Sequence, residues 1–193
     1  MARMTYKAFD DRCSRLIETL RGTVLEVGAG RGANFDALDS SVRWVGLEPN
    51  ERNRRDLRRN AQAAGHGGAP LAAGCEEIPL EDASVDAVLG TFVLCSVREV
   101  DRSLAEIVRV LRPGGSFVFC EHVAAPAGTG KRWLQRVITP ITVCLDHGCH
   151  WDRSTAQAIE RAGLTMTQLD DADVATGSWI PATPCIVGMA VKA

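Results

Sequence analysis

The sequence has no long apolar run, and this absence excludes several classes of protein. Its longest apolar stretch, around residues 87–95, is far shorter than the ~20 residues that a helix needs to span a bilayer. Residues 1–12 contain no apolar core typical of a signal peptide. We therefore expect a soluble protein without an integral membrane segment.

The sequence also has little net charge and no regular framework of cysteines. The 22 Lys and Arg residues nearly balance the 24 Asp and Glu residues, so a net charge of −2 gives no general attraction to nucleic acid. Seven cysteines are an odd number, and Cys95, Cys120 and Cys185 lie inside apolar runs. We expect reduced core cysteines and a cytoplasmic location.

Strand-like and helix-like segments alternate along the chain, which predicts a single α/β domain over residues 1–193. We expect a seven-stranded, mostly parallel sheet with helices on both faces and a short helical insertion, within residues 123–150, after the fifth strand. The predicted strands are 23–27, 42–47, 69–73, 85–90, 116–121, 164–169 and 185–191. The predicted helices are 11–20, 33–38, 51–62, 100–111 and a last one in which Ser154 and Gln157 would form a capping box.

A glycine-rich turn follows the first predicted strand. Gly28, Gly30 and Gly32 allow a sharp turn and a close approach of the backbone to a ligand. Glu48 ends the second predicted strand, where a carboxylate can accept both hydroxyls of a ribose. Turn, acid and strand order together indicate a nucleoside-binding site, although Glu48 alone could simply cap the next helix.

A dinucleotide-dependent dehydrogenase is the alternative, because Gly28, Gly30 and Ala33 also satisfy a loosened dinucleotide fingerprint. The position of Glu26 argues against it, because a carboxylate at the end of the strand would repel a pyrophosphate but could receive an ammonium group. Later segments continue an order of motifs that dehydrogenases do not show: 74–79, 82–88 and 109–115.

With these motifs in this order, residues 24–118 resemble a class I S-adenosylmethionine-dependent methyltransferase, a family with a doubly wound, Rossmann-like fold. The resemblance implies S-adenosylmethionine as the cofactor, with its methionine part at the 28–32 turn and its ribose on Glu48. The implied cofactor-binding residues are Glu26, Gly28, Gly30, Asn34, Glu48, Pro49, Cys75, Glu76, Thr91 and Phe92. Arg31 and Asn53 depart from the family's commoner residues, but neither change threatens cofactor binding.

A narrower resemblance covers the second half of the chain. Residues 91–97, 121–124 and 148–153 are similar to a branch of that family that includes alkyl-thiol S-methyltransferases. This resemblance implies a thiol acceptor. Members of the branch often carry an N-terminal membrane anchor, which we do not expect here because the catalytic domain begins almost at residue 1. The alternatives are O- or C-methylation of a natural-product or quinone-like molecule, and a regulatory cofactor-binding protein without turnover.

His122 is the candidate catalytic residue, because it follows the fifth predicted strand at the sheet edge where ligands bind in such folds. A hydroxyl acceptor would need it as a general base, with His147 as the second candidate, whereas a thiol needs no strong base. His122 could equally be a packed core histidine. Apolar residues of the insertion, such as Trp133 and Val137, predict a small, apolar acceptor.

Two further clusters favour plainer interpretations. Residues 144–150 contain Cys, Asp and His, but their spacing matches no closed zinc pattern, so we expect no metal. The arginines of the predicted 51–62 helix are typical of a solvated face rather than of a nucleic-acid surface. We expect a small-molecule substrate as the partner, and no pattern in the sequence predicts an oligomeric state.

Overall fold

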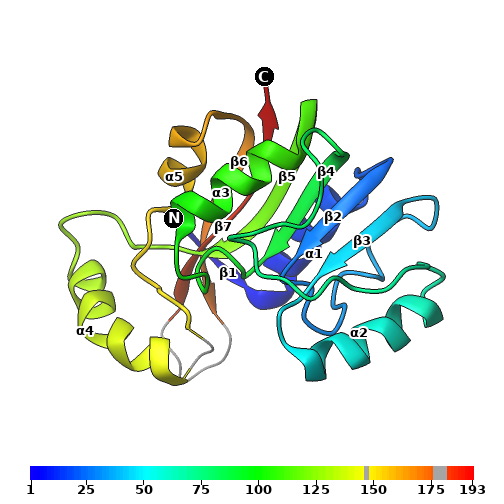
Figure 1. The fold of residues 1–193 in the computed structure, drawn as a ribbon. Helices are drawn as coiled ribbons and strands as arrows, with labels where there is room; N and C mark the ends of the chain where they lie inside the picture. Colours follow the sequence, from blue (N-terminus) through cyan, green and yellow to red (C-terminus); the bar gives the residue numbers. More distant parts are fainter. Residues whose placement is uncertain (146–147, 176–181) are drawn as a thin grey trace.

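The computed structural model describes residues 1–145, 148–175 and 182–193, and within them a central sheet is covered by helices on both faces (Figure 1). The strands are β1 (Ala2–Thr5), β2 (Thr23–Val27), β3 (Arg43–Leu47), β4 (Val85–Thr91), β5 (Leu111–His122), β6 (Leu164–Ala175) and β7 (Thr183–Lys192). The helices are α1 (Tyr6–Ile17), α2 (Glu51–Ala63), α3 (Val100–Val110), α4 (Gly130–Leu145) and α5 (Thr155–Arg161).

The sheet has the strand order β1-β6-β7-β5-β4-β2-β3. β7 runs antiparallel to both of its neighbours, and the other pairs are parallel. The prediction of a doubly wound, seven-stranded and mostly parallel sheet is therefore confirmed. Because β2, β3, β4 and β5 run in the same direction, their carboxyl ends meet at one edge of the sheet, where ligands bind in such folds.

The two faces of the sheet bury separate apolar clusters. In β5, Val118 and Cys120 belong to the cluster that includes residues of α1 and α2, whereas Phe117 and Phe119 belong to the cluster that includes residues of α3 and α5. This alternation follows from the period of two residues in a strand. Phe9 of α1 is 2% exposed, and burial of such a side chain stabilises the fold by roughly 1.5–3 kcal/mol.

The predicted helix at 33–38 and the predicted strand at 69–73 are both wrong. Residues 30–37 form hydrogen-bonded turns, because contacts of the side chains with the core replace a regular helix: Asn34 bonds to Glu26, and the ring of Phe35 packs against Trp44. Residues 69–73 form only an isolated bridge between Leu71 and Leu47. The seventh strand is instead β1, which pairs with the edge of β6.

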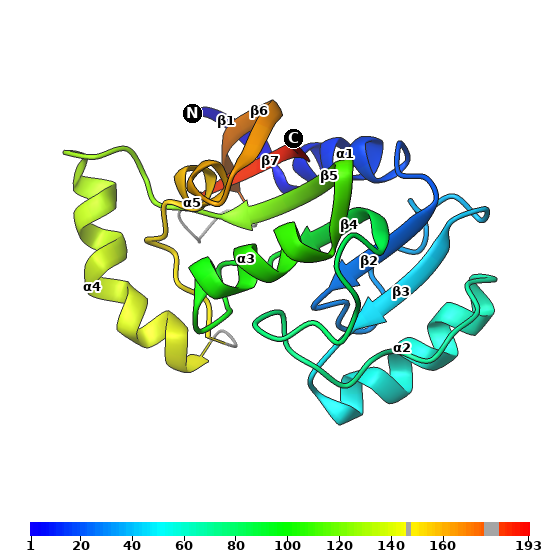
Figure 2. The same cartoon turned by 45° about the horizontal axis from the view of Figure 1, so that its top comes forward.

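Two predictions about helices in the second half also need correction. The insertion holds one helix of 16 residues, α4, which contains Pro140 and lies at the edge of the molecule (Figures 1 and 2). Ser154 is the N-cap residue of α5, but its side chain makes no capping hydrogen bond, so the predicted capping box is wrong. At the other end of the chain, Thr5 caps α1, which begins five residues before the predicted start at residue 11.

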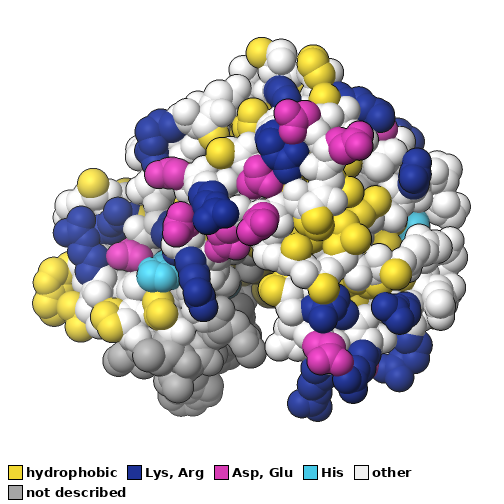
Figure 3. All heavy atoms as spheres, viewed as in Figure 1, with side chains coloured by type: hydrophobic (Ala, Val, Ile, Leu, Met, Phe, Trp, Pro, Cys, Tyr) yellow, Lys and Arg dark blue, Asp and Glu magenta, His cyan; other side chains and the backbone are white. Residues whose placement is uncertain are grey.

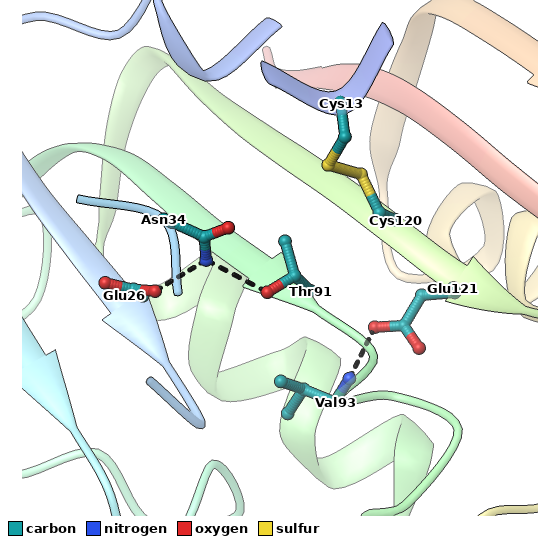
Figure 4. The surroundings of a disulfide bond; sticks show 7 residues. All are labelled: Cys13, Glu26, Asn34, Thr91, Val93, Cys120 and Glu121. Carbon is teal, nitrogen blue, oxygen red and sulfur yellow. Dashed lines mark hydrogen bonds between the residues drawn. A yellow bond between two sulfur atoms is a disulfide. The ribbon is translucent and has the colours of Figure 1, made fainter. Parts of the chain in front are cut away.

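A disulfide joins Cys13 of α1 to Cys120 of β5 (Figure 4). The prediction that Cys120 is reduced is therefore wrong, because the packing of α1 on the sheet brings together two sulfur atoms that are 107 positions apart in sequence. Cys95 and Cys185 are reduced, as predicted. The expected cytoplasmic location rested on reduced cysteines, and the disulfide removes that support.

Candidate functional site

A cavity of about 930 Å³ lies at the carboxyl ends of β2, β3 and β4. Gly28 follows β2, Glu48 follows β3 and Phe92 follows β4, and all three line the cavity. The volume is within the range of about 300–1,000 Å³ that is typical of small-molecule sites. The parallel strands therefore bring the predicted turn and the predicted acid to one site.

The Glu48 carboxylate is fixed in the cavity wall by two backbone groups. Its Oε2 atom accepts a hydrogen bond from the N–H of Gly30 at 3.0 Å, and its Oε1 atom accepts one from the N–H of Asn50 at 2.8 Å. Each oxygen keeps a lone pair for a further donor. Asn50, not Glu48, caps α2, because its side chain accepts from the N–H groups of Arg52 and Asn53. The capping interpretation of Glu48 is therefore wrong.

The glycine turn requires glycine at its first position. Gly28 has a φ of +59°, which is rare for other residues, and a Cβ atom built there would lie 2.6 Å from Cγ2 of Val93. Gly30 has a φ of +56°, but a Cβ atom there would meet nothing closer than the backbone oxygen of Gly28 at 4.0 Å. Gly28 therefore lets the turn pass directly against the loop that follows β4.

A buried network behind the cavity wall links Glu26, Asn34 and Thr91 (Figure 4). Nδ2 of Asn34 donates to Oε1 of Glu26 at 2.7 Å and to Oγ1 of Thr91 at 3.0 Å, and Nε1 of Trp44 donates to Oε2 of Glu26 at 2.7 Å. Burial raises the pKa of Glu26 to about 7, against the lowering effect of its two donors. These predicted residues support the turn and do not belong to the lining of the cavity.

The segment after the predicted third strand forms another part of the cavity wall. Cys75 and Glu76 line the cavity, together with Pro49, Arg31 and Asn53. Oε1 of Glu76 accepts a hydrogen bond from the N–H of residue 98 at 2.9 Å. The Cys75 thiol is buried, and desolvation raises its pKa to about 12, so it stays neutral near pH 7.

The loop that follows β4 is held by two residues to which the sequence assigned no role. The carboxylate of Glu121, at the end of β5, accepts hydrogen bonds from the N–H groups of residues 93, 94 and 95 at 2.8–3.0 Å. The guanidinium of Arg153 donates to the carbonyl oxygens of Leu94 and Val97. An acid inside an apolar strand was the available signal for Glu121. Burial raises its pKa, against the effect of the three N–H donors.

The same loop carries backbone strain at the cavity. Phe92 has a φ of +55°, a conformation that is uncommon for a bulky residue, and its N–H donates to the carbonyl oxygen of Cys120 at 2.7 Å. Such outliers persist where the surrounding structure fixes them, often at ligand sites. The strained residue lines the cavity.

His122 lies behind Phe92 and does not line the cavity. The centroids of the two rings are 4.7 Å apart, and Nδ1 of His122 is 3.3 Å from Sγ of Cys149. His147, the second candidate base, lies outside the described residues. On α4, the side chains of Trp133 and Val137, from which the sequence predicts an apolar acceptor, are 67% and 53% exposed.

The basic cluster of the sequence forms a solvated face of α2. Figure 3 shows the Lys and Arg side chains gathered over this helix, at the lower right of the view. Arg55 pairs with Glu51 and Arg59 pairs with Asp56, so acids of the same helix offset part of the charge. Within the part of the chain that the structure describes, no helix has the length and apolar character needed to cross a membrane.

Comparison with known proteins gives matches along most of the chain. The family described as "Methyltransferase domain" matches residues 25–119. Thiol S-methyltransferase TMT1A of Homo sapiens is 39% identical over 173 residues, covering 88% of this chain and 70% of the relative. Thiol S-methyltransferase TMT1B of Rattus norvegicus is 34% identical over 199 residues, covering 97% of this chain and 81% of the relative.

Solved structures show the same fold at lower identity. A geranyl diphosphate methyltransferase in complex with SAM superposes with a TM-score of 0.75 and 15% identity, covering 96% of this chain and 85% of the other. At that identity the likeness concerns the fold alone. The family match, by contrast, includes the glycine turn, the acid after β3 and the loop after β4.

Proposed function

Because the chain belongs to the class I S-adenosylmethionine-dependent methyltransferases, we propose that it methylates the sulfur of a small, apolar thiol. The observation that carries this proposal is the similarity to two thiol S-methyltransferases over 88% and 97% of the chain. S-adenosylmethionine is the cofactor, as in the family. The cavity at the sheet edge has a volume suited to a small molecule. The net charge of −2 gives no general attraction to nucleic acid.

The residues of the cavity fit the cofactor. Each carboxylate oxygen of Glu48 has a lone pair that can accept from a hydroxyl of the ribose. Gly28 has no Cβ atom, so its backbone can approach the cofactor closely. Cys75 and Glu76 would border the adenine, and the buried carboxyl of Glu26 would support the ammonium end. When bound, the sulfonium supplies a methyl group that is already electrophilic.

The protein's own task is to align the acceptor and to exclude water. Glu121 and Arg153 hold the backbone of residues 93–97, so Phe92, Val93 and Val97 form a fixed apolar part of the wall. A thiol has a free pKa of ~8.5, so a modest shift provides thiolate near neutral pH without a strong base. This agrees with a cavity that His122 does not line.

Transfer of a labelled methyl group to matched acceptors tests the proposal. Purified protein is incubated with S-adenosylmethionine carrying a labelled methyl group and with panels of apolar thiols, phenols and quinones. We expect labelled thioethers and no comparable labelling of the phenols or quinones. Labelled phenols or quinones without thioethers would replace the proposal with O- or C-methylation, and binding of cofactor without any product would favour a regulatory protein.

A further inference from the structure

Three side chains with metal-binding atoms meet beside the cavity. Cys95 lies in the loop after β4, His122 ends β5, and Cys149 follows α4. Their two sulfur atoms and one ring nitrogen all lie within 4.8 Å of one another. Nδ1 of His122 is 3.3 Å from Sγ of Cys149 and 3.9 Å from Sγ of Cys95. Residues far apart in sequence therefore form one compact set of donors.

These separations suit a tetrahedral metal ion. Zinc binds sulfur at about 2.3 Å and imidazole nitrogen at about 2.0–2.1 Å, which places neighbouring donor atoms roughly 3.5–3.8 Å apart. The observed nitrogen–sulfur distances of 3.3 and 3.9 Å bracket this range, so small side-chain movements suffice to bind an ion. Thiolate and imidazole together are a donor set that zinc prefers.

The backbone around the two cysteines is fixed by further hydrogen bonds. The N–H of Cys95 donates to Oε2 of Glu121 at 3.0 Å, and its carbonyl oxygen accepts from the N–H of His150 at 2.7 Å. Cys95 is 1% exposed and Cys149 is 3% exposed. Buried donor side chains on a fixed backbone support metal binding, because they lose little conformational freedom when the ion binds.

The cluster contacts two residues of the cavity wall. Phe92 and Ser96 line the cavity; the ring of Phe92 lies 4.7 Å from that of His122, and Oγ of Ser96 lies 3.6 Å from Sγ of Cys95. The Trp151 ring lies 6.0 Å from His122, and its buried Nε1 finds no hydrogen-bond acceptor among the described residues. An additional acceptor atom beside the cluster would satisfy this donor.

The geometry points to a zinc site formed by Cys95, His122 and Cys149, with the sulfur of the acceptor thiol as the fourth ligand. Three protein ligands and one open position are the pattern of catalytic rather than structural zinc. The identity of the fourth ligand rests on the proposed function, whereas the three protein ligands do not. The sequence expectation of no metal considered only the spacing within residues 144–150, which supply one of the three ligands.

The chemistry of the site balances without an oxidant or reductant. The acceptor thiol loses its proton to solvent when its sulfur binds the metal. An electron pair of that sulfur then forms the new bond to the methyl carbon, while the bond from this carbon to the sulfonium sulfur breaks and its pair stays on the departing sulfur. The product is a neutral thioether, which binds zinc more weakly than a thiolate and can leave.

Metal analysis of the full chain tests the three protein ligands. The protein is stripped with a chelator, incubated with Zn²⁺, desalted and analysed by mass spectrometry. We expect one equivalent of zinc per chain. Cys149→Ala and His122→Ala should each lower the zinc affinity by more than about a hundredfold, since loss of a ligand exceeds the effect of losing its supporting partner. Cys185→Ala is the matched control, because this buried thiol bonds to the carbonyl of Thr183 and lies outside the cluster.

Cobalt in place of zinc tests the fourth ligand. The Co²⁺ form should show thiolate charge-transfer absorption, and butanethiol should change this spectrum whereas butanol should not. Circular dichroism checks that each variant folds, and Cys149→Ser replaces Cys149→Ala, and His122→Asn replaces His122→Ala, where the alanine variant does not fold. Wild-type protein without stoichiometric metal, or variants that keep it, would overturn the site. A spectrum that butanethiol leaves unchanged would overturn the fourth ligand.

The outcomes separate this inference from the proposed function. Thioether formation by a metal-free protein, undiminished by a chelator, would leave thiol methylation standing and remove the zinc site from the reaction. Stoichiometric zinc without any thioether product would leave the site standing and remove the proposed acceptor. Both claims hold together if the chelator abolishes thioether formation and added zinc restores it.

Discussion

The carboxylate of Glu121 accepts a hydrogen bond from the backbone N–H of Val93 at 2.9 Å, across 28 positions of sequence (Figure 4). The same carboxylate holds the next two N–H groups of the chain. The end of β5 thereby fixes the loop that follows β4 and forms part of the cavity wall. This wholly buried acidic side chain thus shapes the wall of the cavity.

Glu121→Gln should lower the free energy of unfolding by about 1–3 kcal/mol, because an amide nitrogen cannot accept and at least one buried N–H loses its partner. Urea denaturation measures this loss. Glu77→Gln is the matched control, since the Glu77 side chain is 89% exposed. Equal stabilities of the two variants would show that Glu121 does not hold the loop.

Gly28→Ala should impair cofactor binding far more than Gly65→Ala. Both glycines have a positive φ, so both variants carry a backbone strain of order 1 kcal/mol. Only at Gly28 does the added Cβ also meet Val93, at 2.6 Å, whereas nothing lies within 4 Å of a Cβ at Gly65. Calorimetric titration with S-adenosylhomocysteine compares the two. Matching affinities would remove the turn from the cofactor site.

Cofactor affinity should rise as the pH increases through about 7, where Glu26 loses its proton. The raised pKa of Glu26 means that the cofactor-free protein favours the neutral acid, whereas an ammonium group favours the carboxylate. The stability of the cofactor-free protein depends on pH in the opposite direction. The contribution of Glu26 to the free energy of unfolding is greatest below its ordinary pKa of 4.5 and falls as the pH rises to about 7.

Titrations with S-adenosylhomocysteine between pH 6 and pH 8 check the predicted rise in affinity. Glu26→Gln has no proton to lose, so its affinity should vary much less over this interval. An unchanged pH dependence in that variant would assign the titrating group elsewhere.

Reduction of the Cys13–Cys120 disulfide should lower the free energy of unfolding by about 2–5 kcal/mol, as for other native disulfides. Thermal unfolding with and without a reductant measures the effect, and Cys13→Ser should show no response to the reductant. Mass spectrometry of alkylated, non-reduced peptides should find these two cysteines linked. Alkylation of both residues in the native protein would contradict the bond.

Local sequence patterns predict the parts of the fold that depend on short-range chemistry. β2 and the turn at Gly28 follow from an apolar run that meets glycines, and Glu48 can be placed because parallel strands end at one edge. The end of helix α2 follows from Gly65, and its two buried residues, Leu57 and Ala61, are four positions apart. The existence and direction of these elements therefore depend on residues that are close together in the sequence.

The remaining features arise from contacts between distant residues. The pairing of β1 with β6 has no local signal, because four mostly exposed residues form the edge of the sheet. Cys13 meets Cys120 only once α1 packs on the sheet. In the same way, spacing within residues 144–150 could not show that Cys149 joins His122 and Cys95, since the other two ligands come from the end of β5 and from the loop after β4.

The most direct test of the account compares two acceptors that differ in one atom. Purified protein is given S-adenosylmethionine with butanethiol or with butanol, and the methylated product is measured by mass spectrometry. The account predicts butyl methyl thioether, formed at a rate that rises with pH until the thiol is ionised, and no ether from butanol. Methylation of the alcohol in preference to the thiol would contradict it.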